Sequence, residues 1–170
     1  MAGRSVIATL LFFLQCIKMD SILNIRKVRE SFLKIIEAIP NDRLNEIPKG
    51  FNNNLIWNFG HVIVTQQQLC YSLSGLDTHV SEAMIHTYRK GTRPEEDVSE
   101  DEVDELKVLA QDTVIRLEND MHDKVFKNYR KYPTQLGMVL HNFDEALVFN
   151  SMHESLHLGY AMAMLKFLDK

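Results

Sequence analysis

The sequence predicts an all-α protein, a four-helix bundle with a long connection between its second and third helices. Over four segments, apolar residues recur at the three- to four-residue spacing of a helix face. No stretch alternates apolar and polar residues over a convincing length, as a half-buried strand would. Long amphipathic helices without strands bury their apolar faces against one another, which gives a bundle.

The first helix is expected at about 21–39, where isoleucine, valine and phenylalanine form one stripe and Pro40 ends the helix. The second is expected at about 53–74, closed by Gly75. A connection of about twenty residues follows, with a short helix expected at 81–88.

A capping box, Ser99 with Glu102, predicts the start of the third helix. The fourth is expected at about 138–168, after the segment YPTQLG. The residues of the third helix that should face inward share its apolar stripe: Val103, Leu106, Ala110, Leu117 and Met121.

Residues 1–18 are expected to be an N-terminal extension ahead of a bundle domain at 19–170. Arg4 followed by SVIATLLFFLQCI resembles the charged and apolar parts of a signal peptide, and this run is too short to span a membrane. No A-x-A cleavage site follows, and Met19 has the character of a natural start. We therefore favour a non-native or misassigned extension, and a cleaved export signal stays open.

Charge and cysteine content limit the classes of partner and the cellular compartment that we expect. The formal net charge of −4 and a pI near 6.0 argue against a nucleic-acid binder. Two cysteines, Cys16 and Cys70, do not make a disulfide framework and favour a reducing compartment. We expect a cytoplasmic protein without nucleic-acid or membrane partners, and a homodimer stays open.

The fourth helix carries a polar patch on an otherwise apolar face. His153 and His157 lie four residues apart, and at helical spacing they share a face with Asn150 and Glu154. Burying these four side chains is costly unless each finds a partner. Two histidines one turn apart can chelate a metal ion, whereas a satisfied polar patch or a surface facet is the alternative.

The segment contains H-E-x-x-H, the zinc-peptidase signature, but the peptidase interpretation fails. Zinc peptidases of this type draw a third ligand from downstream, and LGYAMAMLKFLDK after His157 holds neither His nor Glu. In the longer form of the motif, Tyr160 and Ala163 stand where Gly and His belong.

A third ligand must come from elsewhere, and His61 on the second helix is the candidate. It shares a face with Trp57, Asn58, Thr65 and Gln68, opposite a plainly apolar stripe. That face would suit solvent or the polar lining of a pocket equally well. The remaining histidines are expected at the surface: His79, His86, His122 and His141.

Two motifs together resemble a known family. Trp57-x-x-Gly60-His61 within IWNFGHVIVTQQQLCYSLSG, and FNSMHESLHLGY about ninety residues later, are similar to the DinB-like (DinB/YfiT) superfamily of metal-binding four-helix bundles. The similarity covers about 19–170, and KGTRP and TQLG fit one branch of the group. The resemblance implies that His61, His153 and His157 hold one divalent ion with positions left for water or substrate.

Characterised members of this superfamily are mostly metal-dependent transferases or isomerases that use low-molecular-weight thiols such as bacillithiol or mycothiol. The resemblance thus implies a small-molecule substrate and a thiol S-transferase or isomerase, with zinc first and nickel or iron as alternatives. Glu154 is the candidate catalytic base, or a residue that orients a ligand; the plainer expectation is a solvated glutamate at a pocket rim. A metal-bearing binding module without turnover, or a purely structural ion, would use the same three histidines.

Overall fold

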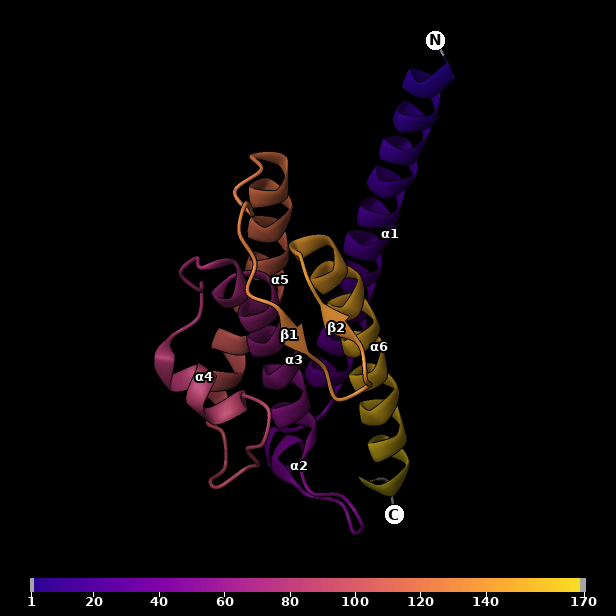
Figure 1. Ribbon diagram of the computed structural model, residues 1–170. Coiled ribbons are helices and arrows are strands. Elements are labelled where there is room, and N and C mark those ends of the chain that lie inside the picture. The colour runs from indigo at the N-terminus through magenta and orange to yellow at the C-terminus, as the bar shows by residue number, and fades with distance from the viewer. Residues whose placement is uncertain (1, 169–170) are drawn as a thin grey trace.

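The computed structural model describes residues 2–168, and four long helices form its framework (Figure 1). These helices are α1 (Ala2–Ala38), α3 (Leu55–Cys70), α5 (Glu100–His122) and α6 (Phe143–Leu168). The predicted all-α bundle is confirmed.

Each long helix packs against two others, in the order α1, α5, α3, α6 around the bundle. Consecutive long helices therefore lie diagonally opposite in two cases, α1 with α3 and α5 with α6, and only α3 and α5 are direct neighbours. The long connection expected between the second and third helices spans 71–99 and contains η1 (Ser72–Ser74) and α4 (Glu82–Tyr88). Because α4 packs on α3, this connection covers one side of the helix that carries His61.

Side-chain caps fix the helix starts that the sequence predicted. The amide oxygen of Asn54 accepts from the Trp57 N–H at 2.8 Å and starts α3. Ser99 caps α5 by accepting from the Glu102 N–H at 3.2 Å, which is half of the expected capping box. The Glu102 carboxylate accepts instead from the Tyr88 hydroxyl at 2.6 Å, so it ties α5 to α4. A short helix α2 (Asn41–Asn45) was not expected.

The expected start of the first helix was wrong. Ser21 does not cap a helix but lies inside α1, where its hydroxyl donates to the Ile17 carbonyl oxygen at 2.9 Å. No proline interrupts the chain before Pro40, and extending a helix costs far less than starting one. In Figure 1 the first turns of α1 extend beyond the other helices. The division into a 1–18 extension and a 19–170 domain stays a prediction.

The expected start of the fourth helix was also wrong, because a small hairpin precedes it. Strands β1 (Tyr132–Pro133) and β2 (Val139–Leu140) pair antiparallel, so α6 begins only at Phe143. The turn between them holds Gly137 at φ 79°, and the Thr134 N–H donates to the Met138 carbonyl at 2.8 Å. These short strands carry too few residues to show alternation, which is why the sequence did not reveal them.

The core surrounds α3, almost all of whose residues are buried. The stripe predicted for α5 is confirmed: Val103, Leu106, Ala110 and Leu117 are buried, and Met121 packs on the core. Within residues 2–168, no helix has the length and hydropathy that crossing a membrane would require.

A buried ion pair joins three of the long helices. On α1, the Arg29 guanidinium donates to both carboxylate oxygens of Glu154 on α6, at 2.7 and 2.9 Å. It also donates to the Val62 carbonyl on α3 at 3.0 Å, and the Asn150 amide donates to Glu154 at 2.8 Å. Arg29 is 2% exposed and Glu154 is fully buried, so neither charge is solvated by water.

Replacing Arg29 with Met should destabilise the protein by about 3–5 kcal/mol, because it leaves the Glu154 carboxylate buried without a counter-charge. Arg26→Met is the matched control, since Arg26 pairs with Glu118 at a partly exposed site and should cost about 1 kcal/mol or less. Urea unfolding measures both. A second change, Glu154→Gln, should restore part of the loss in Arg29→Met; equal costs for Arg29→Met and Arg26→Met would contradict the prediction.

Candidate metal site

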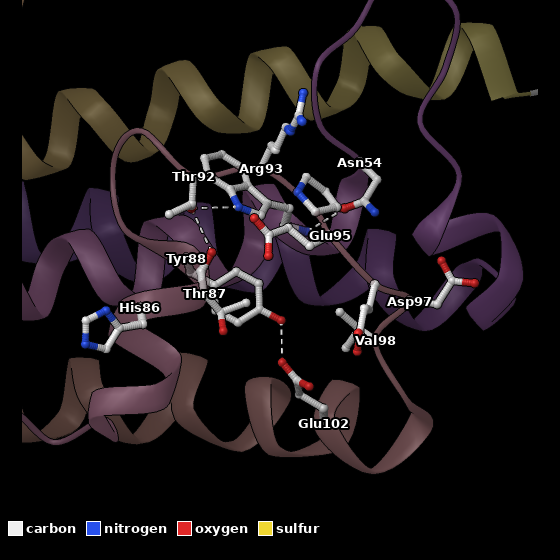
Figure 2. A pocket seen from close by; sticks show the side chains of 13 residues that line it. Asn54, His86, Thr87, Tyr88, Thr92, Arg93, Glu95, Asp97, Val98 and Glu102 are labelled. Carbon is white, nitrogen blue, oxygen red and sulfur yellow. Dashed lines mark hydrogen bonds between the residues drawn. The ribbon is translucent and has the colours of Figure 1, made fainter.

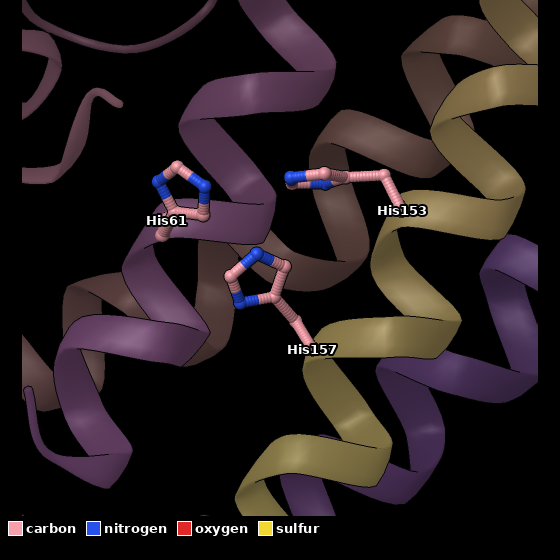
Figure 3. Close-up of side chains that lie close together, drawn as sticks. All are labelled: His61, His153 and His157. Carbon is pink, nitrogen blue, oxygen red and sulfur yellow. The ribbon is translucent and has the colours of Figure 1, made fainter. Parts of the chain in front are cut away.

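Three histidines from two helices meet on one side of the bundle. His61 comes from α3, and His153 and His157 come from successive turns of α6; Figure 3 shows their rings turned toward one another. One ring nitrogen from each lies within 4.8 Å of the other two. His61 is 5% exposed and the other two are half-buried, so the solvent-facing alternative for His61 is excluded.

Hydrogen bonding fixes the ring of His61. Its Nδ1 lies 2.6 Å from the Tyr88 carbonyl oxygen, and a carbonyl only accepts, so Nδ1 carries the proton. The lone pair therefore lies on Nε2, where the Thr65 hydroxyl approaches at 3.3 Å. Such a bond behind the ring is the usual means of orienting a metal-binding histidine.

His157 is fixed in the same way by a side chain of α3. The Asn58 amide nitrogen donates to the Asn54 carbonyl at 2.8 Å, so its amide oxygen faces His157 Nδ1 at 2.9 Å. Nδ1 of His157 must then donate, which leaves its Nε2 with a free lone pair. Both anchored histidines thus present the same nitrogen for coordination.

His153 differs, because its Nδ1 is buried and has no hydrogen-bond partner among the described residues. Its ring centroid lies 5.2 Å from that of His61 and 4.5 Å from that of His157. A buried polar nitrogen without a partner is costly. Coordination of an ion by this ring would offset part of that cost.

The protein holds all three imidazoles in their neutral form. Burial is the main cause, and it lowers the pKa of His153 to about 3 and that of His157 to about 4; the pKa of His61 is also lowered. For His153, the neighbouring histidines and Arg29 add to this effect. Neutral imidazole is the metal-binding form, so the site needs no deprotonation at neutral pH.

The donor set fits a divalent ion of the zinc, nickel or iron class. It comprises three neutral nitrogens within one small region, two of them oriented by hydrogen bonds. A structural zinc site has four protein ligands, whereas reactive sites have three and an open position. Three histidines beside a cavity match the second arrangement.

The histidines line a cavity of about 550 Å³. Its wall is largely apolar on one side, with Leu69, Leu73 and Phe149, and polar where Thr65 and Gln68 face it. The hairpin that precedes α6 contributes further lining residues: Tyr132, Thr134, Gln135 and Leu136. The cavity is large enough for a small organic molecule.

Glu154 does not line this cavity. It is fully buried beneath the histidines and paired with Arg29, so the expectation of a solvated glutamate at the pocket rim was wrong. The sequence could not show this, because Arg29 lies 125 residues away in the chain. Its role as base or orienting residue stays a prediction, and the geometry favours orientation.

The other histidines lie outside the cluster. His86, His122 and His141 are exposed, as expected. His79 is only partly exposed, and its ring packs edge-on against Tyr71 at 4.8 Å, so a plain surface position was wrong for this residue.

Trp57 and Gly60, which belong to the same motif as His61, both help to position its ring. The Trp57 ring stacks on His61 at 4.7 Å with an interplanar angle of 11°, and it lines the cavity. A Cβ at Gly60 would lie 2.5 Å from the Tyr88 ring, so only glycine lets Tyr88 pack here. Nothing in the sequence marks Tyr88, whose carbonyl orients His61, because this residue ends a short helix that carries no periodic signal.

A second cavity, of about 400 Å³, also borders Trp57 (Figure 2). Its lining is acidic, with Glu95, Asp97 and Glu102 among the side chains drawn. The Trp57 indole N–H donates to the Thr92 hydroxyl at 3.2 Å at its edge. The acidic residues between α4 and α5 therefore line a different cavity from the one that His61, His153 and His157 line.

A comparison with protein families finds a match between residues 24–161 and the DinB superfamily. The matched region runs from α1 to α6 and includes all three histidines. A search of curated proteins finds no match to the chain.

Gly60→Ala should lower both stability and metal affinity. The added methyl group clashes with the Tyr88 ring, and overpacking of this kind costs about 1–3 kcal/mol. Displacing the Tyr88 carbonyl from His61 should weaken metal binding roughly tenfold. Gly159→Ala is the control: Gly159 is an exposed residue of α6 with open space around it, so this change should stabilise the helix by about 1 kcal/mol or less. Thermal unfolding and metal titration test both, and unchanged metal affinity in Gly60→Ala would contradict the role given to Tyr88.

The metal-free protein should lose stability as the pH falls below about 6.5. His153 and His157 have a pKa of about 3 and about 4 when folded, against an ordinary value of 6.5. The unfolded chain therefore binds more protons in this window, and protonation favours unfolding. His153→Gln should show a shallower loss between neutral pH and about 4. Urea unfolding across that range measures it, and an equally steep loss in the variant would mean that His153 is not buried in its neutral form.

Proposed function

The chain belongs to the DinB superfamily, and from this premise and its histidine cluster we propose a metal-dependent enzyme that acts on small molecules. We propose that His61, His153 and His157 hold one divalent ion, with zinc as the first choice and nickel or iron as alternatives. The reaction proposed is transfer of a low-molecular-weight thiol to a small electrophile, with isomerisation as the related chemistry.

The observation that carries this proposal is the position of the three neutral imidazoles on the wall of an accessible cavity. An ion that only ties α3 to α6 would be expected in a closed site with a full set of protein ligands. A divalent ion supplies Lewis acidity, which lowers the pKa of a thiol or water that it binds. The cavity beside it offers room for the second reactant.

The chain's own residues have defined parts in this reaction. The Tyr88 carbonyl and the Asn58 amide hold His61 and His157 in the metal-binding orientation. Leu69 and Phe149 exclude water from one side of the cavity. The thiol loses its proton to solvent, its sulfur bonds to the electrophilic carbon, and the leaving group departs with the bonding electron pair.

We propose that Glu154 acts as a positioning residue rather than as the base. Both of its oxygens accept from Arg29, and it lies outside the cavity lining. We also propose a cytoplasmic location, which the two free cysteines favour.

Protein purified without chelator should contain about one metal ion per chain by elemental analysis. It should also consume a thiol such as cysteine in the presence of an electrophile such as chlorodinitrobenzene. Chelation and His153→Ala should each lower this consumption to the rate measured without protein, while His122→Ala, which changes an exposed histidine outside the cluster, should not. Helical content should stay nearly unchanged in both variants.

Two results would redirect the proposal. Stoichiometric metal binding without consumption of any thiol would favour the alternative, a metal-bearing binding module. Full metal occupancy in His153→Ala would show that the three histidines do not form the site.

A further inference from the structure

The cavity beside the histidines has a one-sided charge. The described residues that line it include two cations, Lys90 and Arg130, but no Asp or Glu. The whole chain has 23 acidic residues against 19 lysines and arginines, so its composition would favour a negatively charged lining. The acidic residues near Trp57 line the second cavity instead.

Neither cation forms a salt bridge with a residue that the structure describes. No salt bridge among residues 2–168 involves the side chain of Lys90 or Arg130. Both residues are exposed, so their charges are hydrated at the mouth of the cavity. A pair of uncompensated cations at the mouth of a pocket attracts anions.

The backbone holds Arg130 beside the apolar wall. Its N–H donates to the Leu73 carbonyl oxygen at 2.6 Å, which ties the segment after α5 to η1. Leu73 itself lines the cavity. The guanidinium is therefore carried by a segment with a fixed anchor.

Lys90 is tied to the histidine cluster through Trp57. Lys90 lies in a turn with Gly91 at φ 92°, and the Thr92 hydroxyl closes this turn by donating to the Arg89 carbonyl at 2.8 Å. The same hydroxyl accepts from the Trp57 indole N–H, and Trp57 stacks on His61. A series of direct contacts thus sets the position of Lys90 relative to the histidine cluster.

We propose that the cavity binds a small molecule with an anionic group, which Lys90 and Arg130 hold. The apolar part of the molecule lies against Leu69, Leu73 and Phe149. Its reactive end faces the histidines, and this last step alone rests on the proposed function. A carboxylate and a phosphate monoester share the required charge, whereas a neutral molecule of the same shape gains nothing from the two cations.

The test uses the metal-free full-length chain, so that coordination to a metal cannot mimic the effect. NMR titrations compare phenylacetate, its neutral counterpart phenylacetamide, and benzyl phosphate. The two anions should bind more tightly than the amide, by roughly two- to fivefold for each cation, since exposed ion pairs are weak and screened. Whichever anion binds more tightly identifies the class of group that the site prefers.

The variant Lys90→Met/Arg130→Met should bind phenylacetate and phenylacetamide equally. The matched control is Arg89→Met/Lys131→Met, which removes the adjacent exposed charges that do not line the cavity. It should keep the preference for the anions. An equal loss in both double variants, or no preference in the unmodified chain, would overturn the proposal.

The two proposals fail separately. If the unmodified protein shows no preference for anions but still consumes thiol in a metal-dependent way, only the proposal of an anion site is overturned. If the protein prefers anions but binds no metal, only the proposed reaction is overturned.

Discussion

The ion pair between Arg29 and Glu154 is the interaction on which the histidine site depends. Arg29 holds the Glu154 carboxylate on α6 and the Val62 carbonyl on α3 at once. Glu154 directly follows His153, and Val62 directly follows His61. One guanidinium on α1 therefore contacts the residue that follows a histidine on each of the two helices that supply them, a side-chain carboxylate on α6 and a backbone carbonyl on α3. Removing two charges from water is costly, so such a pair persists only where most of its hydrogen bonds are made.

The ion pair between Arg29 and Glu154 also limits the chemistry that is available at the histidines. Because Glu154 is engaged by Arg29 and Asn150, its charge is compensated below the histidines. The positive charge of Arg29 adds to burial in keeping His153 neutral. No Asp or Glu is among the described residues that line the cavity, so no carboxylate there can act as a base. If the histidines hold a divalent ion, as we propose, a thiol bound to that ion would lose its proton readily without a carboxylate base.

The sequence predicted what local periodicity records and missed what depends on distant partners. Helical spacing placed His153 and His157 on one face, but for His61 periodicity left solvent and pocket equally open, and the family motif resolved the choice. Arg29 falls on the apolar stripe of α1, four residues after Ile25, but several charged residues surround it in the sequence, so nothing local marks it as buried. Its partner lies on another helix, which no local pattern reveals. The hairpin before α6 could not be predicted for a different reason, because strands of two residues are too short to show a periodic pattern.

The arrangement around Trp57 shows how a single side chain separates two electrostatic environments. It borders the acidic cavity formed by the segment between α4 and α5 and the cavity that contains the histidines. Its ring orders His61 by stacking, and its indole N–H orders the turn that carries Lys90. Moving this ring would disturb His61 and the turn that carries Lys90 together. If Lys90 binds an anion and His61 binds a metal ion, as we propose, this rigid aromatic group gives the two events a physical route to influence each other.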